Sequence, residues 1–317
     1  MNTEQNPILR EVRKAIVGKD DVLQKVLATM LAGGHVLLDD VPGVGKTTLA
    51  LAFSRALGLD YRRIQFTSDT TPSDVTGFSL FDPEQRTFRY QPGPVMTQLL
   101  LADEINRTSS KTQAALLEVM EERRVTVDGT THALPEPFLV LATQNPVGSA
   151  GTQLLPPSQL DRFMVRLSMG YPDLASQVAI LRDRYVQNPL DRVEPVCDAA
   201  AFCAMQRAAA AVHTADAVYE YIARLAEATR TRELIELGLS PRGALALCRF
   251  AQATAYLRGR SYVIPPDVAD AFVPVAAHRL VLTRAARIAG TSAEAEAAAV
   301  LHDTPMPPIA TAEPANV

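Results

Sequence analysis

The sequence predicts an α/β protein, in which a parallel sheet covered by helices on both faces is followed by a small all-helical domain. Three observations lead to this prediction. Short apolar runs alternate with helical patterns over the first half of the 317 residues. A glycine-containing loop joins one such run to a helical stretch at residues 39–46. After Pro172, strand patterns nearly vanish and stretches rich in Ala, Leu and Arg take over.

The apolar runs have the length and composition of strands that are buried on both sides, as in parallel sheets. They occupy residues 36–38, 61–66, 99–102, 138–143 and 164–167. Helices are predicted between them, where apolar residues recur with helical spacing, at residues 20–32, 48–57 and 111–124. Strands that alternate with helices in this way predict a single parallel sheet.

Two segments interrupt this alternation and are predicted to be β-hairpins on the surface of the sheet domain. Residues 78–90 alternate in polarity around Asp82-Pro83-Glu84-Gln85. Residues 125–132 carry Asp128-Gly129 between two β-prone triplets, and Asp-Gly supplies the positive φ angles of a tight hairpin turn.

The second half is predicted to be helical at residues 199–212, 217–229 and 241–257. We therefore expect a sheet domain at residues 1–172 and a helical domain at 173–302. The last segment, 303–317, contains four prolines and little apolar content, so we expect a disordered tail there.

Composition narrows the class of protein. The net charge of −4 gives no global reason to expect nucleic-acid binding, and no uninterrupted apolar run is long enough to span a membrane. The N-terminus lacks the basic start and apolar core of a secretory signal, and the three cysteines form no CxxC pair. The five histidines show no metal-ligand spacing, so no zinc site is predicted. We expect a cytoplasmic protein with no direct membrane insertion.

The run VLLDDVPGVGKTTL at residues 36–49 has the layout of a phosphate-binding loop, a strand followed by a Gly-containing turn and a helix. Backbone N–H groups and the helix N-terminus bind phosphates in such loops, while a Lys contacts the outer phosphates and a hydroxyl binds Mg²⁺. Lys46 and Thr47 would take these two roles. The loop residues expected to bind the nucleotide are Pro42, Gly43, Val44, Gly45, Lys46, Thr47 and Thr48.

Asp40 stands where the strict phosphate-loop pattern has a glycine. If this position needs a left-handed backbone, Asp is among the better non-glycine choices, at a cost of roughly 1 kcal/mol. The alternative interpretation, a plain Gly-Pro turn, is disfavoured by Gly-Lys-Thr-Thr at a strand-to-helix junction.

An acidic pair, Asp103 and Glu104, follows the apolar run at residues 99–102. Ligands of α/β sheets bind at the carboxyl ends of the strands, so these side chains are candidates for the same site. Asp103 would hold Mg²⁺ through water, and Glu104 would orient and deprotonate an attacking water. Alone the pair equally fits a strand that ends in solvated acids, but the preceding Gly-Lys-Thr loop favours the catalytic interpretation.

Three further polar residues are candidates for contact with the γ-phosphate. Asn145 ends the run FLVLATQN and would bind the phosphate or the attacking water, although Asn-Pro is also a frequent turn. Arg162 follows a short helix and would act as an arginine finger, whereas its spacing alone fits a surface Arg paired with Asp161. Arg242 falls in the first turn of a helix that begins at Ser240-Pro241, where an anionic ligand would offset its unfavourable interaction with the helix dipole. A solvated Arg is the alternative there.

Together these motifs resemble those of MoxR-type AAA+ ATPases, over residues 8–282. The matching segments are IVGK (16–19), LLDDVPGVGKTTLA (37–50), RIQFTSDTTPSDVTG (63–77), LLLADEINR (99–107), LLEVMEERRVTVDG (116–129), LATQNP (141–146), LPPSQLDRFM (155–164) and LSPRGALAL (239–247). The resemblance implies an AAA+ P-loop domain with two inserted hairpins, followed by a helical lid.

The resemblance also implies roles for individual residues. Asp40 is tolerated in this family, and Val17 and Gly18 would line the adenine pocket. Asp103 and Glu104 correspond to the Walker B pair and Asn145 to sensor 1. Arg162 corresponds to the arginine finger that contacts the ATP of a neighbouring subunit, and Arg242 to sensor 2 in the lid. Arg107 is a second candidate for contact with an adjacent subunit.

The resemblance further implies ATP and Mg²⁺ as ligands, a homo-oligomeric and hexameric ring, and a chaperone that matures a protein client. That client would be a von Willebrand A-type protein or a metalloenzyme, and the hairpins would carry motion to it. Three alternatives remain open: a nucleotide-gated scaffold with little turnover, a magnesium-chelatase-like motor, and a ring acting on nucleic acid. The last is disfavoured because few Lys or Arg residues lie in the hairpins.

Overall fold

The computed structural model describes residues 6–145, 153, 155–186 and 188–308. The chain divides into two compact units, Met1–Arg207 and Ala208–Val317, and each is described here by itself.

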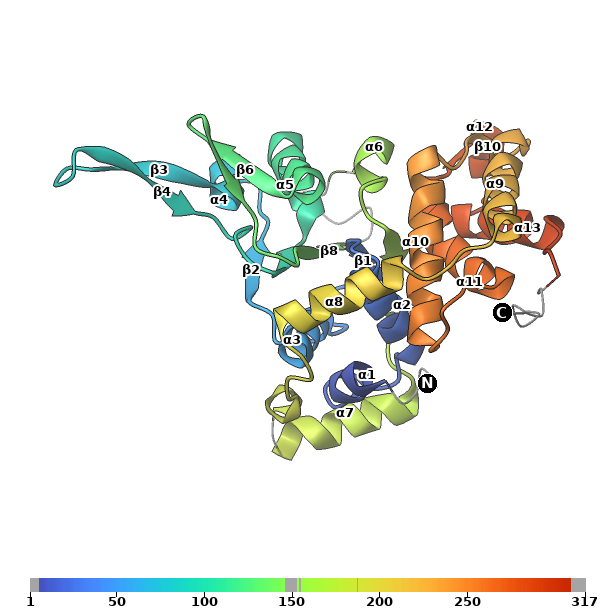
Figure 1. Ribbon diagram of the computed structural model, residues 1–317, viewed down its shortest axis with the longest axis horizontal. Helices are drawn as coiled ribbons and strands as arrows, with labels where there is room; N and C mark the ends of the chain where they lie inside the picture. Colours follow the sequence, from blue (N-terminus) through green and yellow to red (C-terminus); the bar gives the residue numbers. More distant parts are fainter. Residues whose placement is uncertain (1–5, 146–152, 154, 187, 309–317) are drawn as a thin grey trace, which may run out of the picture. The chain divides into compact units, whose positions relative to one another are not determined.

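A five-stranded parallel sheet forms the centre of the first unit (Figure 1). Its strand order is β2-β5-β8-β1-β9. The strands are β1 (Val36–Asp39), β2 (Tyr61–Gln65), β5 (Leu99–Asp103), β8 (Leu139–Gln144) and β9 (Val165–Leu167). All four pairings between neighbouring strands are parallel, which confirms the predicted sheet.

The central strands are buried on both faces because their side chains are apolar at successive positions, not only at alternate ones, until the polar residues at their carboxyl ends. Residues 99–103 of β5 and 139–143 of β8 are all buried. Helices fill the connections and cover the sheet, and most of the residues buried by the longer ones are apolar. They are α1 (Pro7–Arg13), α2 (Asp20–Leu31), α3 (Lys46–Leu57), α4 (Pro72–Thr76), α5 (Ser110–Glu122) and α6 (Pro157–Leu160).

Both predicted hairpins are present, as antiparallel pairs of β3 (Gly77–Asp82) with β4 (Thr87–Pro92) and of β6 (Arg124–Val127) with β7 (Thr130–Ala133). Asp128 and Gly129 have φ values of 48° and 79°, as the Asp-Gly turn requires. The β3–β4 hairpin extends away from the sheet (Figure 1) and exposes Phe78, Leu80, Phe81 and Phe88. At its base, the Tyr90 ring stacks on His132 of the second hairpin, with centroids 4.1 Å apart.

The first unit extends beyond Pro172, because it includes α7 (Leu174–Val186) and α8 (Ala199–Ala210) as far as Arg207. The Lys14 ammonium donates to the carbonyl of Arg192, between these helices, at 3.1 Å. The Gln206 amide in α8 donates to the carbonyl of Met30 in α2 at 2.7 Å. The expected division at residue 172 stays a prediction, although the compact unit ends later in the chain.

The second unit is mainly helical, as expected. Its elements are α9 (Asp216–Thr231), β10 (Ile235–Leu237), α10 (Pro241–Leu257), α11 (Pro265–Ala276), β11 (Val281–Leu282), α12 (Arg284–Ile288) and α13 (Ala293–Asp303). The antiparallel β10–β11 pair was not expected, because strands of two or three residues are too short to show a period of two. Ser240 caps α10 through its hydroxyl, which accepts from the N–H of Gly243 at 3.1 Å.

The buried carboxylate of Asp267 joins the start of α11 to two arginines. It accepts from Arg258 Nη1 at 2.8 Å, from Arg260 Nη1 at 2.7 Å and from the N–H of Ile264 at 2.9 Å. Of the tail expected from residue 303, positions 309–317 lie outside the described residues. Asp303 itself still belongs to α13. None of the helices in the described part of the chain has both the length and the apolar character needed to span a membrane.

Candidate functional site

The loop between β1 and α3 has the backbone of a phosphate-binding loop. Gly43 and Gly45 have φ values of 87° and 100°, a region that L-amino acids with side chains rarely adopt. Gly45 is the N-cap of α3 and has no side chain to accept from the first turn. The N–H groups at the start of this 12-residue helix are therefore oriented toward an incoming anion.

Lys46, the first residue of α3, is 8% exposed. Its ammonium donates to the backbone carbonyl of Asp40 at 2.7 Å. Burial lowers the pKa of Lys46, although the carboxylates of Asp40, Asp103, Asp39 and Glu104 act in the opposite direction. The charge of Lys46 is thus favoured by four carboxylates, which belong to the carboxyl ends of two strands, β1 and β5.

Asp40 has a structural role that the motif comparison missed. Its carboxylate accepts from the hydroxyl of Ser168 at 2.7 Å and from the N–H groups of Met169 and Gly170 at 2.5 and 3.0 Å. Its backbone is not left-handed, because the positive-φ residues other than glycine in the described chain are Arg86, Glu104, Arg123 and Asp128. The expected backbone strain is therefore absent at Asp40, and its side chain joins the loop to the segment after β9.

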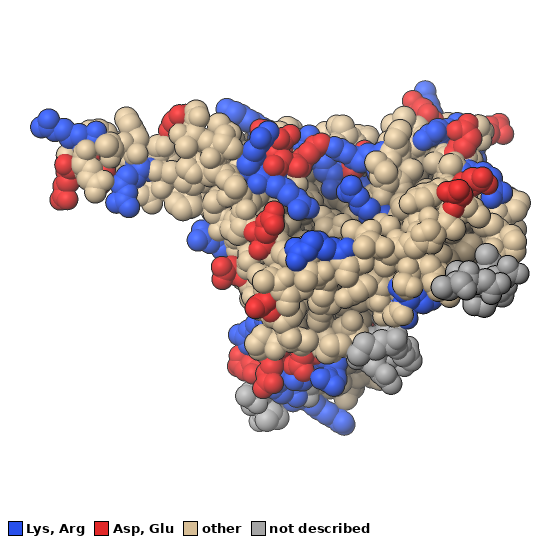
Figure 2. Space-filling model, in the orientation of Figure 1, with Lys and Arg blue, Asp and Glu red and all other residues tan. Residues whose placement is uncertain are grey.

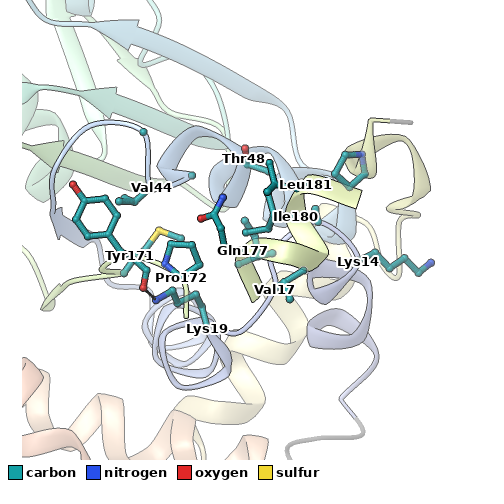
Figure 3. Close-up of a pocket in the computed structure, with 16 residues that line it drawn as sticks. Lys14, Val17, Lys19, Val44, Thr48, Tyr171, Pro172, Gln177, Ile180 and Leu181 are labelled. Atoms are coloured by element: carbon teal, nitrogen blue, oxygen red, sulfur yellow. Dashed lines mark hydrogen bonds between the residues drawn. The ribbon is translucent and has the colours of Figure 1, made fainter. Parts of the chain in front are cut away.

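A cavity of about 410 Å³ adjoins the loop (Figure 3). The expected nucleotide-binding residues Val17, Gly43, Val44, Gly45 and Thr48 line it. Residues of the segment after β9 and of α7 also line it, and sequence reasoning missed them: Met169, Tyr171, Pro172, Gln177, Ile180 and Leu181. The Lys19 ammonium donates to the carbonyl of Tyr171 at 2.9 Å, which holds this segment beside the residues before α2.

Gly18 lies beside this cavity and not in its lining. It has a φ of 71°, and a Cβ atom there would lie 2.1 Å from the Ser176 hydroxyl oxygen. A side chain at position 18 would therefore displace the start of α7. Pro42 and Thr47 lie on the loop and in the first turn of α3, respectively.

Asp103 and Glu104 lie at the carboxyl end of β5, where the neighbouring strand β8 supplies a hydroxyl to both. The buried Thr143 hydroxyl donates to Asp103 Oδ1 at 2.6 Å and accepts from the N–H of Glu104 at 2.9 Å. Glu104 has a φ of 57°, a left-handed conformation that turns the chain sharply at the end of the strand. The parallel register, with Ala102 opposite Ala142, aligns Asp103 with Thr143.

Two side chains hold the Glu104 carboxylate. Asn145 Nδ2 donates to Oε1 at 3.0 Å, and Arg107 Nη1 donates to Oε2 at 2.8 Å. Burial acts to raise the pKa of Glu104, but these hydrogen bonds, the charge of Arg107 and a hydrogen bond from Gln65 outweigh it and lower the pKa. The carboxylate is therefore ionised at neutral pH, and a general base must be ionised to accept a proton from water.

Asn145 is itself held in place by a second amide side chain. Asn106 Nδ2 donates to the carbonyl of Asn145 at 3.0 Å, and Asn106 Oδ1 accepts from the N–H of Asn145 at 3.3 Å. Both residues are buried. The paired bonds fix the backbone of Asn145 and so direct its side chain toward Glu104.

The two predicted arginines belong to different units, Arg162 to the first and Arg242 to the second. Arg162, just after α6, forms an ion pair with Glu121 of α5, with Nε and Oε2 3.0 Å apart. Arg242 lies in the first turn of α10, in the second unit. Arg107 is paired with Glu104 in its own chain, and its contact with an adjacent subunit stays a prediction.

The residues expected to hold Mg²⁺ have suitable chemistry. The ligands offered by Thr47 and Asp103 are oxygen atoms, which this hard cation prefers. Asp103 ends β5 and Thr47 follows the loop after β1, so both lie at the carboxyl ends of strands in one parallel sheet, with β8 between them.

Two family models match the chain, and each falls within one unit. The model described as the ATPase family associated with various cellular activities (AAA) matches residues 35–165, and the AAA lid domain model matches residues 227–300. The chain is 47% identical over 287 residues to YeaC of Bacillus subtilis, covering 90% of each chain. It is 40% identical over 282 residues to Chaperone MoxR1 of Mycobacterium tuberculosis, covering 86% of this chain and 74% of the relative.

The chain belongs to the MoxR family of AAA+ ATPases. A solved structure from Cytophaga hutchinsonii, named as a candidate ATPase, has a TM-score of 0.87 and 34% identity to this MoxR chain. The alignment covers 95% of this chain and 94% of that one. Fold and family are therefore as the motifs predicted.

Sequence reasoning missed several residues of this MoxR site. Thr143 lies two residues before Asn145, and Asn106 lies two residues after Glu104, so their closeness to predicted residues was a usable signal. Arg63 and Gln65 of β2 also contact the acidic pair, but they lie about 40 positions before it. Their involvement follows from the pairing of β2 with β5, which the local sequence does not reveal.

Proposed function

We propose that this MoxR-family protein binds ATP with Mg²⁺ and hydrolyses it at the subunit interfaces of a hexameric ring. One observation carries the catalytic part of the proposal. Asp103 and Glu104, the latter held by Asn145, lie at the carboxyl end of β5, and the phosphate-loop lysine, Lys46, follows the carboxyl end of β1 in the same parallel sheet. This combination supplies a phosphate-binding cation, an Mg²⁺ ligand and a base within one site.

Each residue has a definite task in this proposal. The N–H groups after Gly43 and Gly45 bind the phosphates, and Lys46 exchanges the carbonyl of Asp40 for a phosphate oxygen. Thr47 and Asp103 hold the Mg²⁺, which supplies charge neutralisation at the phosphates when bound. Glu104 orients a water molecule and accepts its proton, while Asn145 holds that carboxylate in place.

The remaining charge stabilisation would come from the two arginines. Arg162 would contact the nucleotide of a neighbouring subunit, after exchanging Glu121 for a phosphate. Arg242 would contact the nucleotide from the lid. ATP and ADP would then favour different arrangements of lid and ring, because only ATP offers the γ-phosphate to these groups.

We further propose that the ring acts as a chaperone for a protein client, a von Willebrand A-type protein or a metalloenzyme. A chaperone is named among the relatives. The β3–β4 hairpin supports a protein partner over a nucleic acid, because residues 77–92 carry two arginines and two acids and several exposed apolar side chains (Figure 2). A nucleic-acid-binding ribbon would carry excess positive charge.

The Glu104→Gln variant tests the catalytic assignment. Gln retains the size of the side chain but accepts no proton, so ATP affinity in a fluorescence titration is expected to stay within about twofold, while turnover falls about 100-fold or more. Glu118→Gln, an exposed change on α5, is the matched control and is expected to have wild-type turnover. Wild-type steady-state hydrolysis by Glu104→Gln would contradict the assignment.

Single-turnover hydrolysis by the assembled wild-type protein separates this proposal from the nucleotide-gated scaffold. The proposed enzyme converts bound ATP to ADP and phosphate in one exponential phase. A scaffold would retain intact ATP over the same period.

A further inference from the structure

The edge strand β2 directs two polar side chains toward the acidic pair of β5. Arg63 and Gln65 are separated by one residue and so point to the same face of the sheet. In the parallel register Arg63 lies opposite Leu101, and Gln65 lies opposite Asp103. The two side chains therefore reach the end of β5 from the edge of the sheet.

Arg63 donates two hydrogen bonds to the carboxylate of Asp103. Its Nη2 and Nε atoms donate to Asp103 Oδ2 at 2.6 and 3.2 Å. The other oxygen, Oδ1, accepts from Thr143 of β8. The carboxylate is thus held from both neighbouring strands, and its side chain is only 12% exposed.

The strand order shows from which side the Arg63 guanidinium approaches Asp103. β5 lies between β2 and β8, and β1, which carries the phosphate loop, lies beyond β8. Arg63 therefore approaches Asp103 from the β2 side of β5, whereas the phosphate loop lies on the β8 side. In this position the guanidinium restrains the carboxylate without standing between it and the loop.

A second link runs from Arg63 to the catalytic glutamate. Arg63 Nη2 donates to the amide oxygen of Gln65, and the Gln65 amide forms a hydrogen bond with the Glu104 carboxylate. A single cation on β2 is in this way connected to both acids of the site. A side chain that forms a hydrogen bond with a metal ligand, without contacting the metal itself, usually affects the metal affinity strongly.

We propose that Arg63 is a positioning residue that orients Asp103 for Mg²⁺ and, through Gln65, steadies Glu104. The proposal rests on the proposed function of the same site. It requires the fork geometry of a guanidinium, because a lysine ammonium is a point charge that cannot give the same paired donation. The alternative is that Arg63 competes with Mg²⁺ for the Asp103 carboxylate. Removal of Arg63 would then strengthen Mg²⁺ binding, whereas the positioning role predicts that it weakens Mg²⁺ binding.

The test is the Mg²⁺ dependence of nucleotide binding by the full-length protein. A fluorescent ATP analogue is titrated in EDTA and then at increasing Mg²⁺. Arg63→Met is expected to raise the Mg²⁺ concentration for half-maximal enhancement of binding about tenfold. Binding in EDTA is expected to be unchanged, because the phosphate loop is not altered.

Two further variants sharpen this test. Arg62→Met is the matched control, since Arg62 points to the other face and donates to the carbonyl of Gly93 at 3.3 Å; it should leave the Mg²⁺ requirement unchanged. Arg63→Lys should raise the requirement less than Arg63→Met does. If Arg63→Met fails to bind even in EDTA, Arg63→Lys decides, and a wild-type requirement in that variant overturns the proposal.

An unchanged or lower Mg²⁺ requirement in Arg63→Met also overturns the positioning role, and a lower one supports competition. Failure of the proposed function gives a different result. In that case the wild-type protein itself does not bind the analogue, or binds it equally well with and without Mg²⁺.

Discussion

The buried histidine His35 makes the stability of the first unit depend on pH in a predictable way. The ring lies in the core between β8 and α5. Its Nδ1 atom accepts from the N–H of Val140 at 3.1 Å, and Nε2 faces the carbonyl of Met120 at 3.2 Å. Both contacts are satisfied when the ring is neutral with its proton on Nε2. A second proton on Nδ1 would break the bond from Val140.

Burial lowers the pKa of His35 from 6.5 to about 4, and the charge of Arg123 acts in the same direction. A folded-state pKa below the unfolded value means that the unfolded chain binds the proton first. Stability from this group is therefore complete above about pH 6.5 and is lost as the pH falls toward 4. The loss amounts to about 2 kcal/mol between pH 7 and pH 5, and about 3 kcal/mol by pH 4.

The assay is urea unfolding followed by circular dichroism at pH 7 and pH 5, for the wild type and His35→Gln. The variant is expected to be less stable at pH 7, because Gln cannot reproduce both ring contacts, but to lose about 2 kcal/mol less on acidification. His302→Gln, a change of an exposed side chain, is the control for the rest of the chain. Equal acid sensitivity of His35→Gln and the wild type would refute the reasoning.

Three substitutions test other parts of the account. Asp40→Gly restores the strict phosphate-loop pattern but removes the three bonds to residues 168–170, so ATP affinity should fall, by about tenfold; equal or tighter binding in a fluorescence titration would contradict this. Thr143→Val removes the hydroxyl shared by the acidic pair, so turnover should fall at least tenfold, and a wild-type rate would show that the hydroxyl is dispensable. Asp267→Ala leaves Arg258 and Arg260 without their shared carboxylate, so the second unit should lose about 3 kcal/mol of stability in chemical denaturation, whereas an unchanged midpoint would exclude this role.

Much of the fold was predictable because it depends on patterns within short segments. Uniformly apolar runs gave the parallel strands, and Asp128-Gly129 gave the turn of the second hairpin. The helix at Pro72–Thr76 was missed, although Thr71 and Asp74 form a capping box that marks its start. That signal is a pair of residues in a helix of only five positions, too short for a hydrophobic period.

The candidate site was predictable where its residues follow strands in the sequence. Lys46, Asp103, Glu104 and Asn145 were found in this way, since each follows an apolar run. The task of Asp40 was not predictable, because its partners lie 128–130 positions away and two of them are backbone N–H groups that any sequence carries. The positions of β2 and β5 as neighbours likewise decide the role of Arg63.

The central claim is that Arg162 of one subunit contacts the nucleotide bound by its neighbour. Arg162→Ala and Lys46→Ala are each expected to be inactive as pure proteins. In a ring that contains both, an intact phosphate loop of one subunit meets an intact Arg162 of its neighbour at roughly a quarter of the interfaces. The control ring mixes Arg162→Ala with a subunit that carries both changes. No subunit of that ring has an intact Arg162, so no interface is restored.

The decisive measurement is the ATPase rate of the two variants co-expressed with different tags and purified over both. The account predicts a substantial rate for the mixed rings of Arg162→Ala with Lys46→Ala, and none for the control pair. Mixed rings as inactive as their components, or a wild-type rate from Arg162→Ala alone, would contradict hydrolysis at a site shared between subunits.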